Sequence, residues 1–412
     1  MTTDGSSGSS AGGTGKGALD GLVVLDLSRI LAGPTCTQML GDLGAEVIKI
    51  ENPATGGDDT RQWGPPFVDG PEGRTDLSAY FLSANRNKRS VALDIATPEG
   101  QALIHRLAAR ADVVVENFKT GGLARYGLDA ETMRAAHPHL VWCSISGFGR
   151  TGPHAEKPGY DLLAQGYGGI MSITGEPDGA PMKVGVGVAD VVCGLQAAIG
   201  ILAALRHRDR TGEGQAIDIG LVDSQMSWLV NVGASHLVSG ETPRREGNAH
   251  ATIVPYGVFA ARDGHVIVAV GNDGQFARFC DFLGRPDWAE DPDFRTNPAR
   301  LAHRARLIAM IEAALAPRSV AEVVEGLEAR RVPVGPVHTV AQALASDQAL
   351  ARGMVVEVPC GAAASGRVRL LGNPLKLSRT PVRYRSAPPV FGTDTEAVLG
   401  ALAEAGAPTP ER

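Results

Sequence analysis

The strongest constraint on the fold is an alternation of short apolar runs with helix-like segments, which begins at Leu22. The run VVLDL is followed by GPTCTQMLGDLGAE and VIKIE, and the order repeats as VALDI, PEGQALIHRLAARAD and VVVEN. Pro98 and Glu99 suit the first turn of a helix, because an amide is dispensable there and a carboxylate complements the helix dipole. Strands that alternate with helices build parallel sheets covered by helices. The sequence therefore predicts an α/β fold.

The length of 412 residues favours two domains rather than one. Residues 1–18 are rich in Gly and Ser and nearly free of apolar side chains, so we expect a disordered tail. We expect residues 19–227 to form the N-terminal part of a large domain. A small domain is expected over 228–330, where strand-like runs precede two amphipathic helices within 301–331. Residues 331–412 contain short strands and one helix over 394–405, and are expected to return to the large domain.

Composition and charge exclude several classes of protein. A net charge of −6 with 43% hydrophobic and 20% charged residues is typical of a soluble globular protein and disfavours nucleic-acid binding. Five scattered cysteines without a C-x-x-C pair argue against a disulfide framework or a metal site. The N-terminus has no signal-peptide pattern, and no uninterrupted apolar stretch reaches about eighteen residues, so we expect no membrane contact. A reducing cytoplasm fits these features.

The first strand-helix junction lacks the G-x-G-x-x-G spacing that brings a backbone against a dinucleotide pyrophosphate. A nicotinamide-dependent oxidoreductase is therefore disfavoured. The junction offers Ala32-Gly33-Pro34 instead, where small residues let a ligand approach the backbone and helix amides can attract an anion. A tight turn explains the same residues equally well.

Three further segments carry polar side chains suited to a ligand. Four cations lie in GGDDTRQWGPPFV and SANRNKRSVALD, namely Arg61, Arg86, Lys88 and Arg89. Such side chains match carboxylates or phosphates of a ligand, but they could also form a solvated run of charges. VVVENFKTGGLARYGL places polar and aromatic side chains after a strand, where ligands sit in doubly wound sheets. A simple connecting loop is an equally good interpretation of that segment.

Asp190 ends the small-residue run GVGVAD and begins a strongly apolar helical stretch that extends to about Arg208. As an N-cap it would accept hydrogen bonds from first-turn amides, which is the simpler role on spacing alone. As a nucleophile it could attack a thioester carbonyl and release a thiolate, while glycine amides bind the oxyanion. Asp161, which follows Gly159-Tyr160, is a second carboxylate of the same kind. Among the ten scattered histidines, His250 in GNAHATIVPY is the candidate for a functional role.

The chain as a whole resembles the family III CoA-transferases, a group that includes formyl-CoA transferase, carnitine CoA-transferase and, by homology, 2-methylacyl-CoA racemase. The likeness runs from Leu19 to about residue 400 and depends on the order of six segments: LDLSRILAGPTCTQMLGDLGAEVIKIE, NRNKRSVALD, ADVVVENFKTGGLARYGL, SISGFGRTGP, GYDLLAQG and GVGVADVVCGLQAAIGILAAL. It implies a Rossmann-like large domain that binds CoA, a smaller second domain, and a homodimer whose two chains are threaded as interlocked rings.

The resemblance also implies roles for individual residues. It places the catalytic aspartate at Asp190, which would form a covalent intermediate by double displacement. It places the contacts to CoA at Leu31, Ala32, Asn117, Phe118, Arg125 and Tyr160. The implied substrates are an acyl-CoA and a small carboxylic acid, and neither a metal nor a redox cofactor is needed.

Departures from the family pattern narrow the expected activity. Formyl-CoA transferase has a glycine-rich active-site loop where this chain reads RREGNAHATIVPYG, which disfavours formate or oxalate as a substrate. The racemases read G-H-D-I-N-Y where this chain reads GYDLLA, which weakens the case for proton shuttling. GGDDTRQWGPPFV, NRNK and HATIVPY resemble the dicarboxylate subgroup that includes succinyl-CoA:glutarate CoA-transferase. We therefore expect succinyl-CoA as donor and a dicarboxylate as acceptor, with Arg61, Arg86 and His250 as substrate-binding candidates.

Two alternatives stay open at this point. A 2-methylacyl-CoA racemase on the same fold would exchange the α-proton of its substrate with solvent deuterium. A non-catalytic CoA-binding protein would bind acyl-CoA and exchange nothing.

Overall fold

The computed structural model describes residues 16–404, so residues 1–15 of the expected tail lie outside the described residues. The chain divides into two compact units, each with its own core. The first comprises the residues up to Gly168, Gly185–Leu229 and the residues from Arg352 onward, and the second comprises Gly169–Val184 and Val230–Ala351. The second unit thus extends past residue 330, the boundary expected from the sequence, and also includes a short segment from before residue 228.

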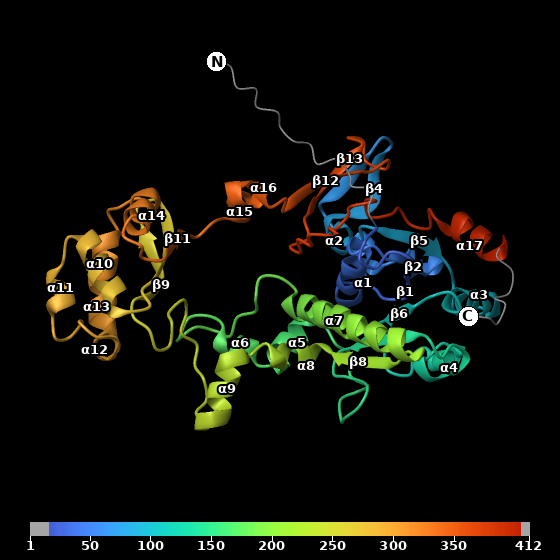
Figure 1. The fold of residues 1–412 in the computed structure, drawn as a ribbon, viewed down its shortest axis with the longest axis horizontal. Helices are drawn as coiled ribbons and strands as arrows, with labels where there is room; N and C mark the ends of the chain where they lie inside the picture. The colour runs from blue at the N-terminus through green and yellow to red at the C-terminus, as the bar shows by residue number, and fades with distance from the viewer. Residues whose placement is uncertain (1–15, 405–412) are drawn as a thin grey trace, which may run out of the picture. The chain divides into compact units, whose positions relative to one another are not determined.

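A six-stranded parallel sheet forms the centre of the first unit (Figure 1). Its spatial order is β5-β2-β1-β6-β7-β8, so the order reverses between β1 and β6. The strands are β1 (Val23–Asp26), β2 (Glu46–Glu51), β5 (Lys88–Ala92), β6 (Val113–Glu116), β7 (Val141–Ser146) and β8 (Ala216–Gly220). Every neighbouring pair is parallel, which confirms the predicted α/β fold with a helix-covered parallel sheet.

Helices cover both faces of this sheet because successive strand residues point to opposite sides. Val24 of β1 packs with the first face and Leu25 with the second. The first face is covered by α1 (Ala32–Asp42), α5 (Asp161–Tyr167), α7 (Val188–Thr211) and α8 (Leu221–Ser227). The second is covered by α3 (Pro98–Ala108), α4 (Ala130–Ala136) and α17 (Thr395–Glu404). The first turn of α3 contains Pro98, as its sequence predicts, and Thr97 provides the N-cap.

Smaller elements complete the first unit. Two antiparallel hairpins are formed by β3 (Phe67–Gly70) with β4 (Gly73–Ser78) and by β12 (Val355–Pro359) with β13 (Arg367–Leu371). The short helix α2 (Ala79–Ala84) follows β4. Three 3₁₀ turns lie at η1 (Pro53–Thr55), η2 (Asp59–Gln62) and η3 (Ala124–Tyr126).

The C-terminal segment of the first unit is bound to the end of α1. The Arg385 guanidinium donates hydrogen bonds to the carbonyls of Gly41, Gly44 and Ala45 at 2.6–2.9 Å. The Asn373 side chain donates to the buried carboxylate of Asp42 at 2.8 Å. The C-terminal segment thus adds hydrogen bonds to carbonyls at and just after the C-terminus of α1, where a helix has no further turn to supply them.

The second unit contains a three-stranded antiparallel sheet in the order β11-β10-β9. Its strands are β9 (Tyr256–Ala261), β10 (Gly264–Ala269) and β11 (Val334–Pro336). Its helices are α6 (Ile170–Ile173), α9 (Val230–Ser239), α10 (Asp273–Leu283), α11 (Asp287–Glu290), α12 (Asn297–Ala302), α13 (Arg304–Leu315), α14 (Val320–Glu328), α15 (Val340–Ala345) and α16 (Asp347–Ala351). The core joins β10 to α10, α13 and α14 through Val266, Phe276, Ile311 and Val323. Helices α13 and α14 are the two amphipathic helices predicted within 301–331.

Helix α7 is long and apolar enough, by length and composition, to cross a membrane. Half of its most apolar window is buried, however, and its residues pack in the core with α1 and β7. The central helix of a globular protein meets the same criterion, so α7 is only a weak indication of a membrane span.

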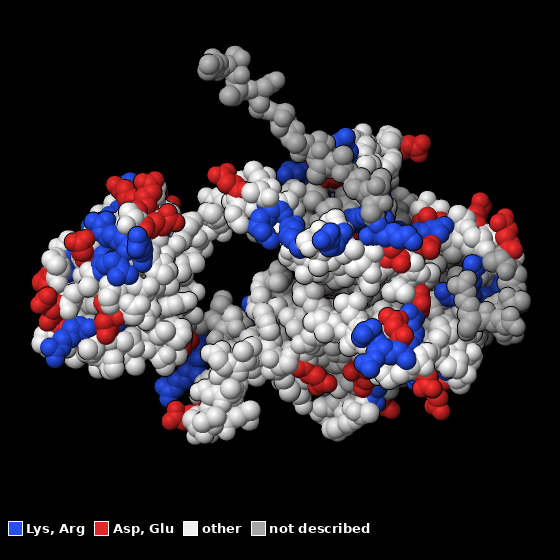
Figure 2. Space-filling view, viewed as in Figure 1, with Lys and Arg blue, Asp and Glu red and all other residues white. Residues whose placement is uncertain are grey.

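Charged side chains of both signs are interspersed on the visible face of the second unit (Figure 2). This mixture agrees with the small net charge of −6 for the whole chain. The five cysteines are free and buried.

Candidate active site

Asp190 lies in the first turn of α7, and only 9% of its surface is exposed. The N-cap of this helix is Gly187, which has no side chain to accept a hydrogen bond. No described residue donates a hydrogen bond to the Asp190 carboxylate. The simpler role considered for Asp190, that of an N-cap, is therefore wrong.

Asp161 at the start of α5 takes that role instead. Its Oδ1 accepts hydrogen bonds from the backbone amides of Ala189 at 2.8 Å and Asp190 at 3.4 Å. Its Oδ2 accepts one from Nε2 of Gln165 at 2.7 Å. Just before α5, Gly159 meets Gly147 backbone to backbone, where any side chain would clash.

The pKa of Asp190 is raised to about 7, first by burial and then by the negative charge of Asp161. Burial disfavours an ionised carboxylate, and a second carboxylate nearby disfavours it further. Strongly shifted carboxyl groups of this kind concentrate at functional sites. Asp190 is thus a buried carboxyl group with a strongly raised pKa at the start of a helix.

The loop between β1 and α1 lies beside the start of α7. A Cβ atom added to Gly187 would lie 3.1 Å from Cδ2 of Leu31, so these two residues are in close contact. Ala32 is buried in the same core, and its carbonyl lies against Gly194 of α7. The structure therefore brings Leu31 and Ala32, two expected contacts to CoA, next to Asp190.

Asn117 holds the same loop by its backbone. Its Oδ1 accepts a hydrogen bond from the amide of Arg29 at 3.0 Å, and its Nδ2 donates one to the Arg29 carbonyl at 2.7 Å. Both ends of the Asn117 side chain are thus used to connect the end of β6 to the loop after β1. This pairing assigns Asn117 a role in positioning the loop.

Lys49 and Asp58 bind the backbone of the same loop, and the sequence had predicted a role for neither residue. Nζ of Lys49 lies 2.9 Å from Oδ2 of Asp58 and donates to the Ser28 carbonyl at 2.8 Å. The Asp58 carboxylate also accepts a hydrogen bond from the amide of Ile30 at 3.2 Å. The available signal was a lysine inside the apolar run VIKIE, since a buried lysine requires a partner.

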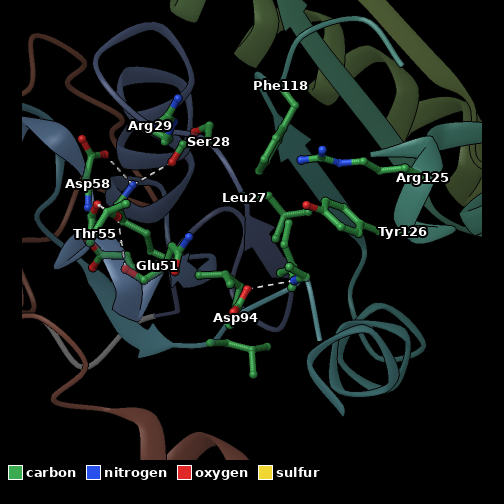
Figure 3. A pocket seen from close by; sticks show the side chains of 17 residues that line it. Leu27, Ser28, Arg29, Glu51, Thr55, Asp58, Asp94, Phe118, Arg125 and Tyr126 are labelled. Carbon is green, nitrogen blue, oxygen red and sulfur yellow. Dashed lines mark hydrogen bonds and ion pairs between the residues drawn. The ribbon is translucent and has the colours of Figure 1, made fainter. Parts of the chain in front are cut away.

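A cavity of about 230 Å³ opens at the carboxyl ends of β1, β2, β5 and β6 (Figure 3). This is the edge at which the strand order reverses, where open α/β sheets bind ligands. Phe118, Arg125 and Tyr126 line one side of it, and Thr55 and Asp58 line the other. The Arg125 guanidinium lies 4.5 Å from the centroid of the Tyr126 ring. The cavity thus combines aromatic faces with an exposed cation, which suits a nucleotide-bearing ligand.

Arg61 does not face a ligand. Its side chain is fully buried, with Nε and Nη2 bound to the two oxygens of Glu51 at 2.8 and 2.7 Å. Its Nη1 donates to Asp76 at 2.7 Å and to the Pro389 carbonyl at 3.1 Å. These partners occupy the guanidinium, so the expected contact of Arg61 with a substrate carboxylate is not supported.

Arg86 is committed in the same way. Its Nε and Nη2 bind the two oxygens of Asp42 at 2.8 and 2.6 Å, and its Nη1 donates to the Leu371 carbonyl at 2.8 Å. Lys88 is also buried, 3.1 Å from Asp26, and Arg89 pairs with Glu46 at the surface. The basic segment over 61–89 is therefore largely structural.

Two candidates remain, Tyr160 in the first unit and His250 in the second. Tyr160 is 63% exposed at the N-cap of α5, and its side chain makes no capping bond. His250 belongs to the second unit, where its Nδ1 accepts a hydrogen bond from the amide of Thr252 at 3.1 Å. Its ring packs against that of Tyr256 at a centroid distance of 5.2 Å.

Comparison with known proteins identifies the family. The model of "CoA-transferase family III" matches residues 19–395. The succinate–glutarate CoA-transferase of Agrobacterium fabrum is 47% identical over 94% of this chain and 96% of the relative. The human succinyl-CoA:glutarate CoA-transferase is 39% identical over 92% of this chain and 85% of the relative. The succinyl-CoA:mesaconate CoA-transferase of Haloarcula hispanica is 43% identical over 88% of this chain and 91% of the relative.

A solved structure agrees with these matches. The crystal structure of a CAIB/BAIF family protein from Brucella suis superimposes with a TM-score of 0.87 and 46% identity. The alignment covers 94% of this chain and 100% of that one. The predicted resemblance is confirmed, and the chain belongs to CoA-transferase family III.

Proposed function

We propose that this chain transfers coenzyme A from succinyl-CoA to a free dicarboxylate through a covalent intermediate on Asp190. The observation that carries the proposal is the state of Asp190, which is buried at the start of α7, is not used as a cap and has its pKa raised to about 7. A carboxylate in this state is a stronger base than an exposed one, and is freed from the stabilising bonds that would weaken it as a nucleophile.

The proposed reaction is a double displacement. An oxygen of Asp190 attacks the thioester carbonyl and the C–S bond breaks. CoA departs as a thiolate, and a mixed anhydride between Asp190 and the donor acid remains. The thiolate then attacks Cγ of Asp190, the bond from Cγ to the bridging oxygen breaks, and the donor acid leaves with that oxygen. The acceptor carboxylate repeats the sequence in reverse, which regenerates Asp190 and releases the new acyl-CoA.

The proposed place for the nucleotide end of CoA is the cavity at the carboxyl ends of the strands. Phe118 and Tyr126 offer ring faces for a base, and Arg125 offers a cation for a phosphate. The strand order, with its reversal beside this cavity, supports the expected Rossmann-like character of the large domain. The thioester end would then extend toward Leu31 and Asp190.

The choice of a dicarboxylate acceptor is supported by the names of the relatives, which act on glutarate or mesaconate. It no longer draws support from Arg61 and Arg86, whose guanidinium groups are bound to Glu51 and Asp42. The free and buried cysteines are consistent with a cytoplasmic protein.

A homodimer is proposed on the family resemblance and on an apolar stripe along α7. Leu195, Ile199 and Leu202 lie at helical spacing and are exposed by 38%, 67% and 37%. Apolar stripes of this kind on a globular unit mark interfaces with another protein surface. We expect light scattering of the purified protein to give a particle mass equal to that of two chains.

The function is tested by incubating the protein with succinyl-CoA and glutarate and following glutaryl-CoA by mass spectrometry. We expect Asp190→Ala to abolish exchange while the protein remains folded and still binds CoA. Protease digestion of the wild-type protein after mixing with succinyl-CoA should yield an Asp190 peptide heavier by a CoA adduct. A loss of less than about tenfold in rate, equal to about 1.4 kcal/mol of barrier, rejects Asp190 as the nucleophile.

A further inference from the structure

We infer that Asp161 is a positioning residue for Asp190. Asp161 caps α7, a role that Asp190 could otherwise take, and this keeps Asp190 both the stronger nucleophile and the poorer leaving group. The inference rests on the proposed function for its chemical consequence. Its structural part, the effect of Asp161 on Asp190, stands on the geometry of α5 and α7.

The geometry gives Asp161 the bonds that a helix normally offers to its own first-turn carboxylate. The amides of Ala189 and Asp190 both point to Oδ1 of Asp161, at 2.8 and 3.4 Å. Gln165 fixes the other oxygen from one turn further along α5. A Cβ atom on Gly187 would lie 3.6 Å from Cγ of Asp161, so Gly187 leaves room for this approach. Asp161 is therefore held in place from both helices.

The groups that face Asp190 do not compensate for its burial. Asp161 of α5 adds a negative charge. Tyr80 of α2 interacts electrostatically with Asp190 and has its own pKa raised, by burial and then by Asp190. Cys193, one turn along α7, is buried, and burial raises its pKa to about 12, so it stays a neutral thiol. Among the described residues, no Lys or Arg acts on the Asp190 carboxylate.

The chemical consequence concerns the mixed anhydride, which has two carbonyl carbons open to the CoA thiolate. Attack at the acyl carbon expels the Asp190 carboxylate and returns to the starting thioester. Attack at Cγ of Asp190 expels the donor acid and moves the reaction forward. The weaker base leaves more readily. The donor acid is the weaker base, because an ordinary carboxylic acid has a pKa of about 4.3, below the pKa of about 7 for Asp190. Burial of Asp190 and, after it, the charge of Asp161 thus direct the anhydride toward the enzyme-bound thioester.

Asp161→Asn removes the negative charge but keeps the helix cap, because the amide oxygen of asparagine still accepts the two backbone hydrogen bonds. Asp161→Ala removes both. Asp129 supplies a matched control, because its Oδ1 accepts bonds from the amides of Glu131 and Thr132 at 3.1 Å in α4, away from Asp190. Asp129→Asn makes the same chemical change at a helix cap without touching the active site.

The measurement is the titration of Asp190, followed through its carboxyl carbon by ¹³C NMR and assigned with Asp190→Asn. We expect Asp161→Asn to move the midpoint down by about 1 pH unit or more, and Asp129→Asn to leave it in place. The acid limb of the pH profile of kcat/KM should move by the same amount, with kcat lowered. An unchanged midpoint in Asp161→Asn overturns the inference.

The outcome is separable from that of the proposed function. If the wild-type protein forms no CoA adduct on Asp190, the covalent mechanism fails, yet the NMR titration still decides whether Asp161 controls Asp190. If the adduct forms and the titration midpoint does not respond to Asp161→Asn, the mechanism survives and the role of Asp161 is refuted.

Discussion

Lys49 and Asp58 form an ion pair 2.9 Å long in which each side chain is only 1% exposed. The same lysine binds the Ser28 carbonyl, and the same aspartate binds the amide of Ile30, so the pair holds the loop that precedes α1 from two points. Burial alone would lower the pKa of Lys49, but Asp58 and then Asp26 raise it above its usual value. The lysine is therefore charged, and its removal would leave the buried carboxylate of Asp58 without a counter-ion.

We expect Lys49→Met to lower the free energy of unfolding by about 3–5 kcal/mol, because breaking a buried pair leaves an uncompensated charge. Urea unfolding at neutral pH measures this change. Arg89→Met is the matched control, since Arg89 belongs to an ion pair with Glu46 at the surface and should change stability by about 0–1 kcal/mol. Equal effects of the two substitutions would contradict the structural role of Lys49.

The ionisation of Asp190 predicts a pH dependence of stability. Its pKa is about 7 in the folded chain, whereas an unfolded aspartate titrates near about 3.9. Between these values the folded chain keeps a proton that the unfolded chain has released, so the free energy of unfolding falls as pH rises. We expect wild type to lose roughly 3 kcal/mol relative to Asp190→Asn between about pH 4 and about pH 7. Parallel stability curves for the two proteins in urea would show that Asp190 titrates normally.

Arg125 and Asn117 should respond differently to truncation. Arg125 is exposed at the cavity, so Arg125→Ala should raise the KM for succinyl-CoA about tenfold with little change in kcat, as expected for uniform binding. Asn117 holds the backbone of Arg29, so Asn117→Ala should also lower kcat through the displaced loop. Steady-state kinetics of both variants measure the difference. Arg110→Ala, an exposed arginine outside the cavity, is the control that should alter neither constant.

Arg61→Gln should act on stability rather than on substrate choice. The substitution removes a guanidinium bound to Glu51 and Asp76, which predicts a loss of about 3–5 kcal/mol in the free energy of unfolding. The ratio of kcat/KM for glutarate over butyrate should stay at the wild-type value in the folded protein. A selective loss of glutarate activity with unchanged stability would restore Arg61 as a substrate contact.

The sequence predicted the parts of the fold that depend on local patterns. The alternation after Leu22 is the parallel sheet, and the apolar stretch after Asp190 is α7, which ends at Thr211, close to the expected Arg208. The strand expected at VALDI instead begins at Lys88, because the buried pair of Lys88 with Asp26 extends it into a charged segment. The pattern of apolar residues cannot predict this pair, since Asp26 lies 62 residues away from Lys88 in the chain.

The same reason explains the errors at the site. Arg61 and Arg86 were assigned to a substrate because cations in a loop resemble a carboxylate site. Their actual partners, Glu51 and Asp42, come from β2 and α1 and are brought to them by the sheet. Asp161 was noted only as a second carboxylate of the same kind as Asp190, because its bond to the first turn of α7 depends on a contact between α5 and α7 that the sequence does not show.

The bonds from the C-terminal segment to α1 set the order in which the first unit can be completed during synthesis. The ribosome delivers α1 early, together with Arg86, which binds the Asp42 carboxylate. The bonds from Arg385 to the carbonyls of Gly41, Gly44 and Ala45, and the bond from Asn373 to Asp42, come from residues that are synthesised much later. The whole of the segment Val230–Ala351 is translated in between. The bonds of Arg385 and Asn373 to the end of α1 can therefore form only after the whole of that segment has been synthesised.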